Sequence, residues 1–463
     1  MGVGAFLEPL VVITLLFSGI WINRKRDIAR SNSRNSSSLG TACDNGLADE
    51  DILQPRTYPS DLKGPCARGE YTRSHSPSLV SDQMNRWRKR NVSFLTWKME
   101  VITPNTAVFR DRLLSRLLQK FPFLVECWYW ALVYWTYQLG RAFTAVTLQA
   151  GTVDVARRHA LQLIELEEKL CIFWEIEIQQ YFLQRPLLMT WINRIYSFVH
   201  IPGTVAFLVW LYYYNITRNR LQARWLNRGG GTTDRSLAGA GFYQARRRTM
   251  AVCNLLAFVA FTIWPCMPPR LLSDKSVKGP IGEVARSYGF VDTVHGIGGA
   301  RSVWTQNKFC NQYAAMPSLH FGYSLMIGLT IMAIPLDPPH HRLHTLALPF
   351  SKDLESHEGS KLRLPPWRRV AYFVIGFAYP FTILVAIVAT ANHFILDAVA
   401  GAIVCGLGWW GNSTLLNLLP IEDYVLWALR IHKPEHRIFD VKRFVYNDIE
   451  DRDIPTPGVV RKI

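Results

Sequence analysis

The sequence predicts an all-α, polytopic integral membrane protein: a helical bundle with about seven transmembrane helices and one interfacial helix. Of the 463 residues, 49% are hydrophobic. They gather into blocks of roughly 17–25 residues, the length that crosses a bilayer. The formal net charge of +17 comes from Arg and Lys that border these blocks. That distribution is typical of cytosolic membrane flanks and argues against a nucleic-acid-binding protein.

The N-terminal region divides into an anchor and an arm. Residues 6–22 form the first apolar block, and Arg24, Lys25 and Arg26 follow it directly. We therefore assign residues 1–22 to an uncleaved membrane anchor whose C-terminal side is cytosolic. Residues 23–120 are rich in Ser, Asn, Arg and Pro with little periodicity, so we expect a disordered cytosolic arm.

Residues 121–430 form the predicted membrane domain, and residues 431–463 form a cytosolic tail. The remaining crossings are expected at residues 121–138, 195–214, 250–264, 316–335, 370–389 and 394–410.

The segment 153–183 has helical spacing of its leucines but carries five glutamates, so we expect it to lie on the membrane surface. Glu167 and Glu175 are interpreted as part of a solvated face rather than as a carboxylate pair. His200, within the third crossing, is interpreted as a packed, hydrogen-bonded histidine.

The loop 215–248 is the strongest topology indicator. It holds eight arginines and one acid, Asp234, so we expect it in the cytosol. Alternating sides from there puts the loop 267–315 in the lumen of an endomembrane, the endoplasmic reticulum or Golgi.

Three short motifs stand at the ends of apolar blocks: Met267-Pro-Pro-Arg270, Ala315-Met-Pro-Ser-Leu-His320 and Ala391-Asn-His393-Phe-Ile-Leu-Asp397. Arg270 ends the fourth crossing and His320 opens the fifth. Two further crossings return the chain to the same face at His393. The number of crossings therefore predicts one shared pocket, whichever way the protein is inserted.

The residue types in these motifs suit phosphoryl transfer without a metal or cofactor. Asp397 is four residues after His393 on one helix face, so it can accept the Nδ1 hydrogen and leave Nε2 as the nucleophile. His320 can protonate a leaving alkoxide. Arg270 can bind phosphate oxygens with its planar donors, and the motif neighbours Ser318 and Asn392 are assigned to substrate binding with it.

At these residues the chain resembles the type 2 phosphatidic acid phosphatase superfamily, in its branch of inositolphosphotransferases related to inositol phosphorylceramide synthase. The resemblance covers roughly residues 121–410. It implies that His393 forms a phosphohistidine, that Asp397 supports it, that His320 acts as acid and that Arg270 binds phosphate. Leu319 replaces the glycine of the phosphatase motif, which matches the inositolphosphotransferase branch. The implied substrates are membrane phospholipids, with ceramide as an acceptor.

The sequence departs from the phosphatase pattern at two cationic positions. The arginine expected six residues before the nucleophilic histidine is Ile387, and the lysine expected seven residues before Arg270 is Ile263. Candidate replacements in the lumenal loop are Lys275, Lys278 and Arg301.

The same residues are also compatible with three other functions. A lipid phosphate phosphatase would transfer the phosphoryl group to water. A metal-dependent membrane hydrolase would use the histidines as ligands, and its sensitivity to chelators would distinguish it. A lipid-binding protein would show no turnover. The cluster His340, His341 and His344 has metal-like spacing, but it lies on the opposite face and is interpreted as a solvated loop.

The predicted topology can be tested with glycosylation sites. Sequons occur at Asn35, Asn91, Asn215 and Asn412, and all four fall on the cytosolic side, so we expect them to be unmodified. A sequon engineered between residues 275 and 299 should be glycosylated. A glycosidase-sensitive shift of the native protein on a gel would show that the orientation is inverted or that the first block is not an anchor.

Overall fold

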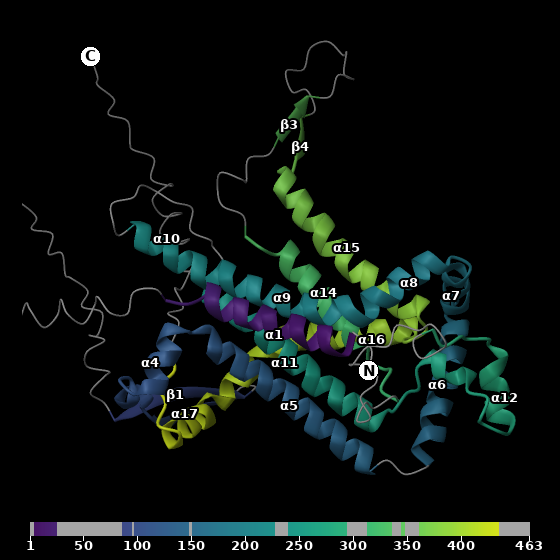
Figure 1. Cartoon of the computed structure of the whole chain (residues 1–463), viewed down its shortest axis with the longest axis horizontal. Helices are drawn as coiled ribbons and strands as arrows, with labels where there is room; N and C mark the ends of the chain where they lie inside the picture. Colours follow the sequence, from purple (N-terminus) through teal and green to yellow (C-terminus); the bar gives the residue numbers. More distant parts are fainter. Residues whose placement is uncertain are drawn as a thin grey trace, which may run out of the picture.

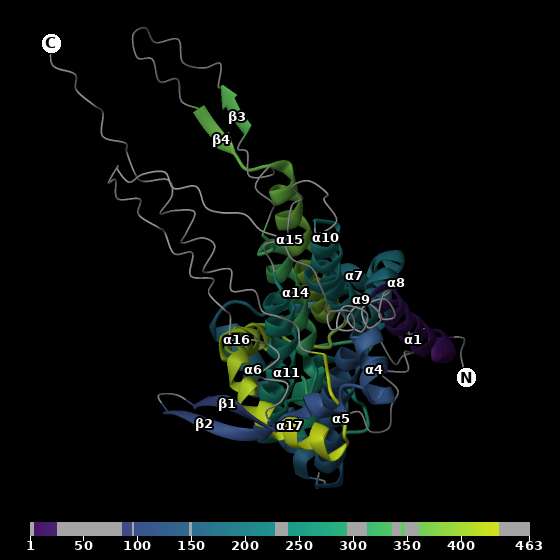
Figure 2. The same cartoon turned by 90° about the vertical axis from the view of Figure 1, so that its left-hand side faces the viewer.

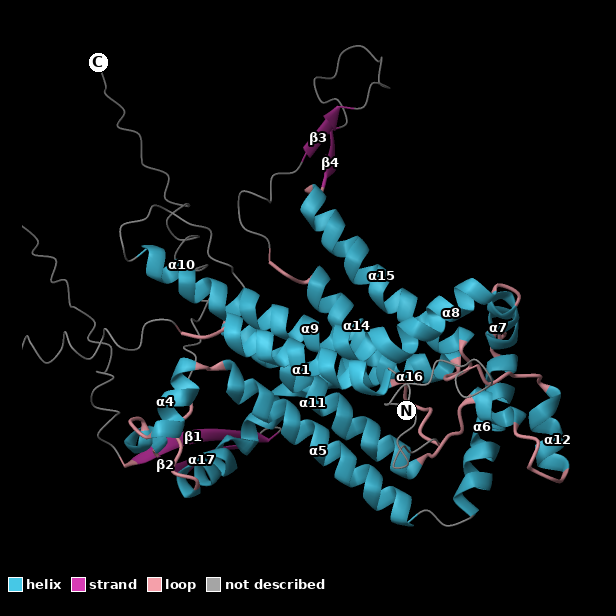
Figure 3. Cartoon of the chain, in the orientation of Figure 1, coloured by secondary structure: helices cyan, strands magenta, loops and turns pink. Residues whose placement is uncertain are grey.

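The structure is a computed structural model that describes residues 4–25, 86–94, 97–147, 151–226, 239–293, 313–335, 344–347 and 361–434. Helices dominate this part of the chain (Figure 3). The principal helices are α1 (Gly4–Ile22), α4 (Leu113–Lys120), α5 (Phe123–Thr147), α6 (Gly151–Lys169), α7 (Glu175–Leu183), α8 (Pro186–Arg194), α9 (His200–Tyr212), α10 (Asn219–Leu226), α11 (Ala240–Ile263), α12 (Pro280–Ser287), α14 (Leu319–Met332), α15 (Trp367–Ala389), α16 (Ile395–Gly411) and α17 (Leu419–Ala428).

Helix α14 occupies the middle of the bundle, in contact with α9, α11, α15 and α16 (Figures 1 and 2). Close approach depends on glycines. A Cβ atom added at Gly328 of α14 would lie 2.1 Å from the carbonyl oxygen of Gly376 on α15. A Cβ at Gly401 of α16 would lie 2.3 Å from the carbonyl oxygen of Ser318, just before α14. These small residues let the backbones meet, as is common between membrane helices.

Two helices of the described part are long and apolar enough to cross a membrane, Trp367–Ala389 and Ile395–Ala428. A third candidate is the pair Pro186–Phe198 and His200–Gln222, which is bent by 53°. Short π-helical turns at Ile195–Val199 and Tyr213–Arg218 interrupt this run. The chain is a membrane protein, whereas the count of seven crossings stays a prediction.

The predicted all-α class needs a correction, because two small antiparallel sheets are present. Strand β1 (Trp87–Phe94) pairs with β2 (Trp97–Pro104), and β3 (His344–Ala347) pairs with β4 (Lys361–Leu364). The first hairpin and α4 occupy residues that we expected to be a disordered arm, so that expectation was wrong for residues 86–94 and 97–120. Residues 26–85 and the tail beyond residue 434 lie outside the described residues.

The arginine-rich loop is also more regular than expected. Helix α11 begins at Ala240, well before the predicted crossing, and carries three consecutive arginines in its first turns. Arg247 contacts the buried carboxylate of Glu126 on α5 at 2.8 Å, and the Tyr243 hydroxyl donates to the same carboxylate. Pairing within the protein allows this arginine to lie in a helix instead of a solvated loop.

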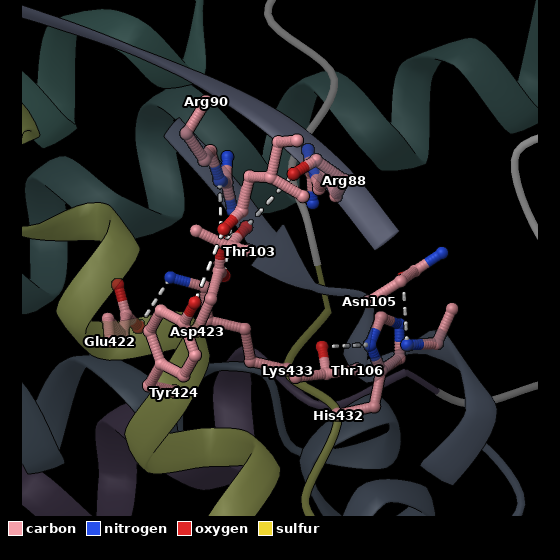
Figure 4. Close-up of polar contacts among 12 residues, drawn as sticks. Arg88, Arg90, Thr103, Asn105, Thr106, Glu422, Asp423, Tyr424, His432 and Lys433 are labelled. Carbon is pink, nitrogen blue, oxygen red and sulfur yellow. Dashed lines mark hydrogen bonds and ion pairs between the residues drawn. The ribbon is translucent and has the colours of Figure 1, made fainter. Parts of the chain in front are cut away.

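The two ends of the bundle have different coverings. Helices α6, α7 and α12 gather at one end, and the β1–β2 hairpin, α4 and α17 gather at the other (Figure 1). Figure 4 shows how the hairpin is attached. Arg90 donates to both carboxylate oxygens of Asp423 on α17, at 2.8 and 3.0 Å, and the Thr103 hydroxyl donates to Asp423 at 2.9 Å. A two-point ion pair to the buried Asp423 therefore helps to fasten the hairpin, together with hydrogen bonds such as those between Ser93 and Asn417.

We expect Arg90→Met to loosen the hairpin, because it leaves the buried Asp423 carboxylate without its cation, at a cost of roughly 3 kcal/mol. The matched control is Lys89→Met, since Lys89 makes only an exposed pair with Glu100 that contributes less than about 1 kcal/mol. Thermal unfolding in detergent and limited proteolysis between residues 86 and 104 would measure the difference. Equal effects of the two substitutions would contradict this account of the attachment.

Candidate active site

The three motifs come together at the end of the bundle that α6, α7 and α12 cover. Backbone hydrogen bonds join them directly. The Arg270 amide donates to the Ala391 carbonyl at 2.9 Å, and the Ser318 amide donates to the Asp397 carbonyl at 2.9 Å. The predicted convergence of segments about 130 positions apart therefore holds in the structure, and backbone contacts produce it.

The orientation of His393 comes from a backbone carbonyl. Its Nδ1 lies 2.8 Å from the Ala315 carbonyl oxygen and 3.5 Å from Asp397 Oδ2. A carbonyl can only accept, so Nδ1 carries the hydrogen and Nε2 is left with a free lone pair. The tautomer is the one expected from the sequence, but Ala315 sets it, because 3.5 Å is too long for Asp397 to be the principal partner.

Asp397 has a second task at the start of α16. Its Oδ2 accepts a hydrogen bond from the Phe394 amide at 2.9 Å, which caps the helix. Its Oδ1 is buried and has no hydrogen-bond partner among the described residues. The carboxylate therefore stands beside the imidazole as a nearby negative charge while it holds the helix end.

His320 lies beside His393, with 5.6 Å between the ring centroids. The Tyr196 ring stacks on His320 with 4.8 Å between centroids, and the centroid of the His200 ring is 4.9 Å from that of His320. His200 is buried, and its Nδ1 is 3.4 Å from the Tyr379 hydroxyl, as expected for a packed histidine. The contact of His200 and Tyr196 with a candidate catalytic ring was not predicted, because nothing local to residues 195–200 indicates it.

Arg270 is buried, so it is not an interfacial anchor that extends its charge to water. It lies in a 3-10 turn, Pro269–Ser273. Its Nε donates to the Asn392 side-chain oxygen at 2.8 Å, and a terminal nitrogen is 3.5 Å from Asp292. Asn392 in turn donates to the Thr390 hydroxyl at 2.7 Å. This chain of contacts links the guanidinium to the turn that presents His393.

Ser318 is placed as the N-cap of α14. Its hydroxyl is buried and accepts from the Phe321 amide at 3.4 Å. The closeness of Gly401 to its backbone indicates a packing role. Substrate binding by Ser318 and Asn392 stays a prediction.

The two positions at which the sequence lacks an expected cation, Ile387 and Ile263, differ in their exposure. Ile387 is fully buried, and its carbonyl accepts from the amides of Asn392 and His393. Ile263 is 73% exposed at the end of α11. Lys275 and Lys278 are exposed in the described part of the loop, and Arg301 lies outside the described residues.

The prediction that Glu167 and Glu175 belong to a solvated face was wrong, although Glu165, Glu168 and Glu177 of the same segment are exposed. The segment forms two helices, and Glu167 of α6 and Glu175 of α7 are both fully buried. They contact the start of α16, next to the candidate site. A usable indication was present in the sequence, since Glu167 lies on the same helix face as the buried Leu163 and Ile164.

Comparison with known protein families identifies the part of the chain that contains the three motifs. A family model described as the PAP2 superfamily matches residues 161–227, 237–350 and 362–411. The matched segments contain Arg270, His320, His393 and Asp397, and also Glu167 and Glu175. No curated protein and no solved structure gives a significant match. Over these segments the chain is similar to the PAP2 superfamily.

Proposed function

We propose that this chain is a membrane lipid phosphotransferase or phosphatase that acts through a phosphohistidine on His393. The observation that carries the proposal is the donation of Nδ1–H to Ala315, which leaves Nε2 as a nucleophile beside a second histidine and a buried arginine. The similarity to the PAP2 superfamily supports a reaction on lipid phosphates.

The first half of the reaction forms the intermediate. Nε2 of His393 attacks the phosphorus of a lipid phosphate ester, the nitrogen–phosphorus bond forms, and the bond to the leaving oxygen breaks. His320 gives the leaving oxygen its proton. Arg270, which has a terminal nitrogen 3.5 Å from Asp292, neutralises the phosphate oxygens.

The second half reverses the roles. His320, now neutral, takes the proton of an acceptor hydroxyl, whose oxygen attacks phosphorus while the nitrogen–phosphorus bond breaks. Water as acceptor makes the protein a phosphatase. The resemblance in the Pro-Ser-Leu-His motif favours a lipid alcohol such as ceramide, with a phosphoinositol group transferred and the site on the lumenal face of the endoplasmic reticulum or Golgi. Purified protein incubated with labelled phosphatidylinositol, with and without ceramide, tests this directly. A labelled sphingolipid would identify the transferase, labelled water-soluble inositol phosphate would show transfer to water, and release of inorganic phosphate from labelled phosphatidic acid would identify a phosphatase.

His393→Ala and His320→Ala should each abolish turnover in this assay, because the first removes the nucleophile and the second removes the proton donor. For His393→Ala we expect a loss of roughly 10⁴-fold. Brief exposure to substrate followed by an alkaline quench should trap acid-labile phosphate on the wild-type protein but not on His393→Ala. His432→Ala is the control, since His432 contacts Thr106 at the other end of the bundle. Activity of His393→Ala or His320→Ala within a few fold of the wild type would refute the catalytic role of that histidine.

Asp397→Asn should lower turnover by about 100-fold, less than loss of the nucleophile. An asparagine oxygen can still accept from the Phe394 amide, and Ala315 still fixes the tautomer of His393. What disappears is the negative charge that stabilises the imidazole when it becomes cationic. Steady-state rates, compared with the yield of trapped phosphohistidine, would measure the effect. A neutral result would remove Asp397 from the reaction and leave it only its capping role.

A further inference from the structure

The first turn of α16 is held by three carboxylates from three different helices. The Phe394 amide donates to Asp397 at 2.9 Å, the Ile395 amide donates to Glu175 at 2.8 Å, and the Leu396 amide donates to Glu167 at 2.8 Å. One carboxylate at a helix start is common, because it meets unpaired amides and the positive end of the helix dipole. Three at one buried helix end is more negative charge than that end can balance.

The second oxygens of the two glutamates indicate how the charge is reduced. Oε2 of Glu167 and Oε2 of Glu175 are buried and receive no hydrogen bond from any donor of the described residues. The two carboxyl groups accept from consecutive amides of the chain, and each affects the ionisation of the other. Two ionised carboxylates buried together would repel each other and would leave both second oxygens unsatisfied. A proton held by one carboxyl and donated to the other would remove the repulsion and satisfy these oxygens.

We propose that Glu167 and Glu175 form a proton-sharing carboxyl pair that positions the N-terminal turn of α16, and through it Asp397 and His393, for the reaction. The glutamates are positioning residues, because they act on the helix through the Ile395 and Leu396 amides. This proposal depends on the proposed function only for the expected effect on turnover.

The connection from the pair to the site is short. The amides that the glutamates hold belong to Ile395 and Leu396, which separate His393 from Asp397 in the chain. A displaced first turn would move the Asp397 carbonyl away from the Ser318 amide and the Asp397 carboxylate away from Nδ1 of His393. A misplacement of about 1 Å is enough to reduce catalysis by about 100-fold.

The charge state of the pair depends on its surroundings. Burial raises the pKa of Glu167 to about 9, and the neighbouring charge of Glu175 adds to the effect. Burial also raises the pKa of Glu175. The other titratable groups that face the pair are Asp397 of α16, which raises both values, and the Cys266 thiol after α11, whose own pKa is raised mainly by burial. The shared proton is therefore present at neutral pH.

The direction of the pH effect follows from the raised pKa. In the unfolded chain a glutamate ionises near pH 4.3, so the folded state binds one proton more than the unfolded state between there and pH 9. The stabilisation that this proton provides is lost as pH rises through about 9, when both carboxylates ionise and repel each other and Asp397. Turnover and thermal stability should then fall together.

Single glutamine substitutions test the shared proton. In Glu167→Gln the amide oxygen can accept from Leu396 and the amide nitrogen can donate permanently to Glu175, so the substitution imitates the protonated state. Activity at neutral pH should stay within about threefold of wild type, and the alkaline loss should move up by at least about one pH unit. Glu175→Gln should behave alike. The matched controls are Glu168→Gln and Glu177→Gln, exposed glutamates on the same two helices, which should leave the pH profile unchanged.

The double variant Glu167→Gln/Glu175→Gln separates this proposal from a purely steric role. Its two amide nitrogens face each other as donors, so it should lose about tenfold or more activity at neutral pH, although each single change is tolerated. The proposal would be overturned if activity were lost at the same alkaline pH in the wild type and in both single variants. It would also be overturned if the double variant were as active as the single variants.

Two measurements that do not depend on turnover test the carboxyl pair separately from the proposed function. The infrared carbonyl band of a protonated carboxylic acid should be present at neutral pH in the wild-type protein and absent from both single variants. The thermal unfolding temperature of the wild type should fall between about pH 8 and pH 10, and that of Glu167→Gln should fall less. Absence of the band from the wild type would refute the pair whatever the enzyme assays show. A band without turnover would instead count against the proposed function alone.

Discussion

The start of α16 is a helix end that lies inside the protein, and much of the structure follows from that constraint. The first amides of a helix have no partner within it, and at this depth water cannot satisfy them. Here Asp397, Glu167 and Glu175 accept their hydrogen bonds. These contacts fasten α6 and α7 to the bundle, and they concentrate negative charge next to His393.

The candidate site is built mainly from backbone contacts between turns. The Cys266 amide donates to Tyr313, and the Ala315 amide donates back to Cys266, so the segment before α14 is paired with the segment after α11. The carbonyl of Ala315 then points at Nδ1 of His393. A backbone carbonyl that is held by neighbouring hydrogen bonds moves less than a long side chain, which suits a nucleophile that needs one tautomer.

Both ends of the bundle use the same kind of attachment for different purposes. At the site end, buried carboxylates accept from helix amides, and the arrangement is sensitive to protonation. At the other end, Asp423 is neutralised by a two-point contact with Arg90, so its charge is balanced at every ordinary pH. The presence or absence of a cation beside a buried carboxylate thus distinguishes a fixed joint from one that can respond to a proton.

The sequence by itself determined the features that depend on local pattern. Apolar blocks of bilayer length identified the helices that carry the motifs, and the number of crossings between the motifs placed Arg270, His320 and His393 at one end. The spacing of four residues correctly indicated that Asp397 lies near His393, but the shared helix face was wrong, because α16 begins only at Ile395 and His393 lies in the turn before it.

Only the tertiary structure decided the features that depend on distant partners. The Ala315 carbonyl, and not Asp397, is the main partner of Nδ1, and no side-chain pattern encodes the direction of a carbonyl. The β1–β2 hairpin was hidden in a polar stretch because its stability comes from α17, more than 300 positions away. Glu175 looked solvated because charged residues usually are, yet it lies buried against an amide 220 positions further along the chain. Whether a carboxylate is a surface charge or a structural acceptor depends on what packs against it, and that is settled only when the chain folds.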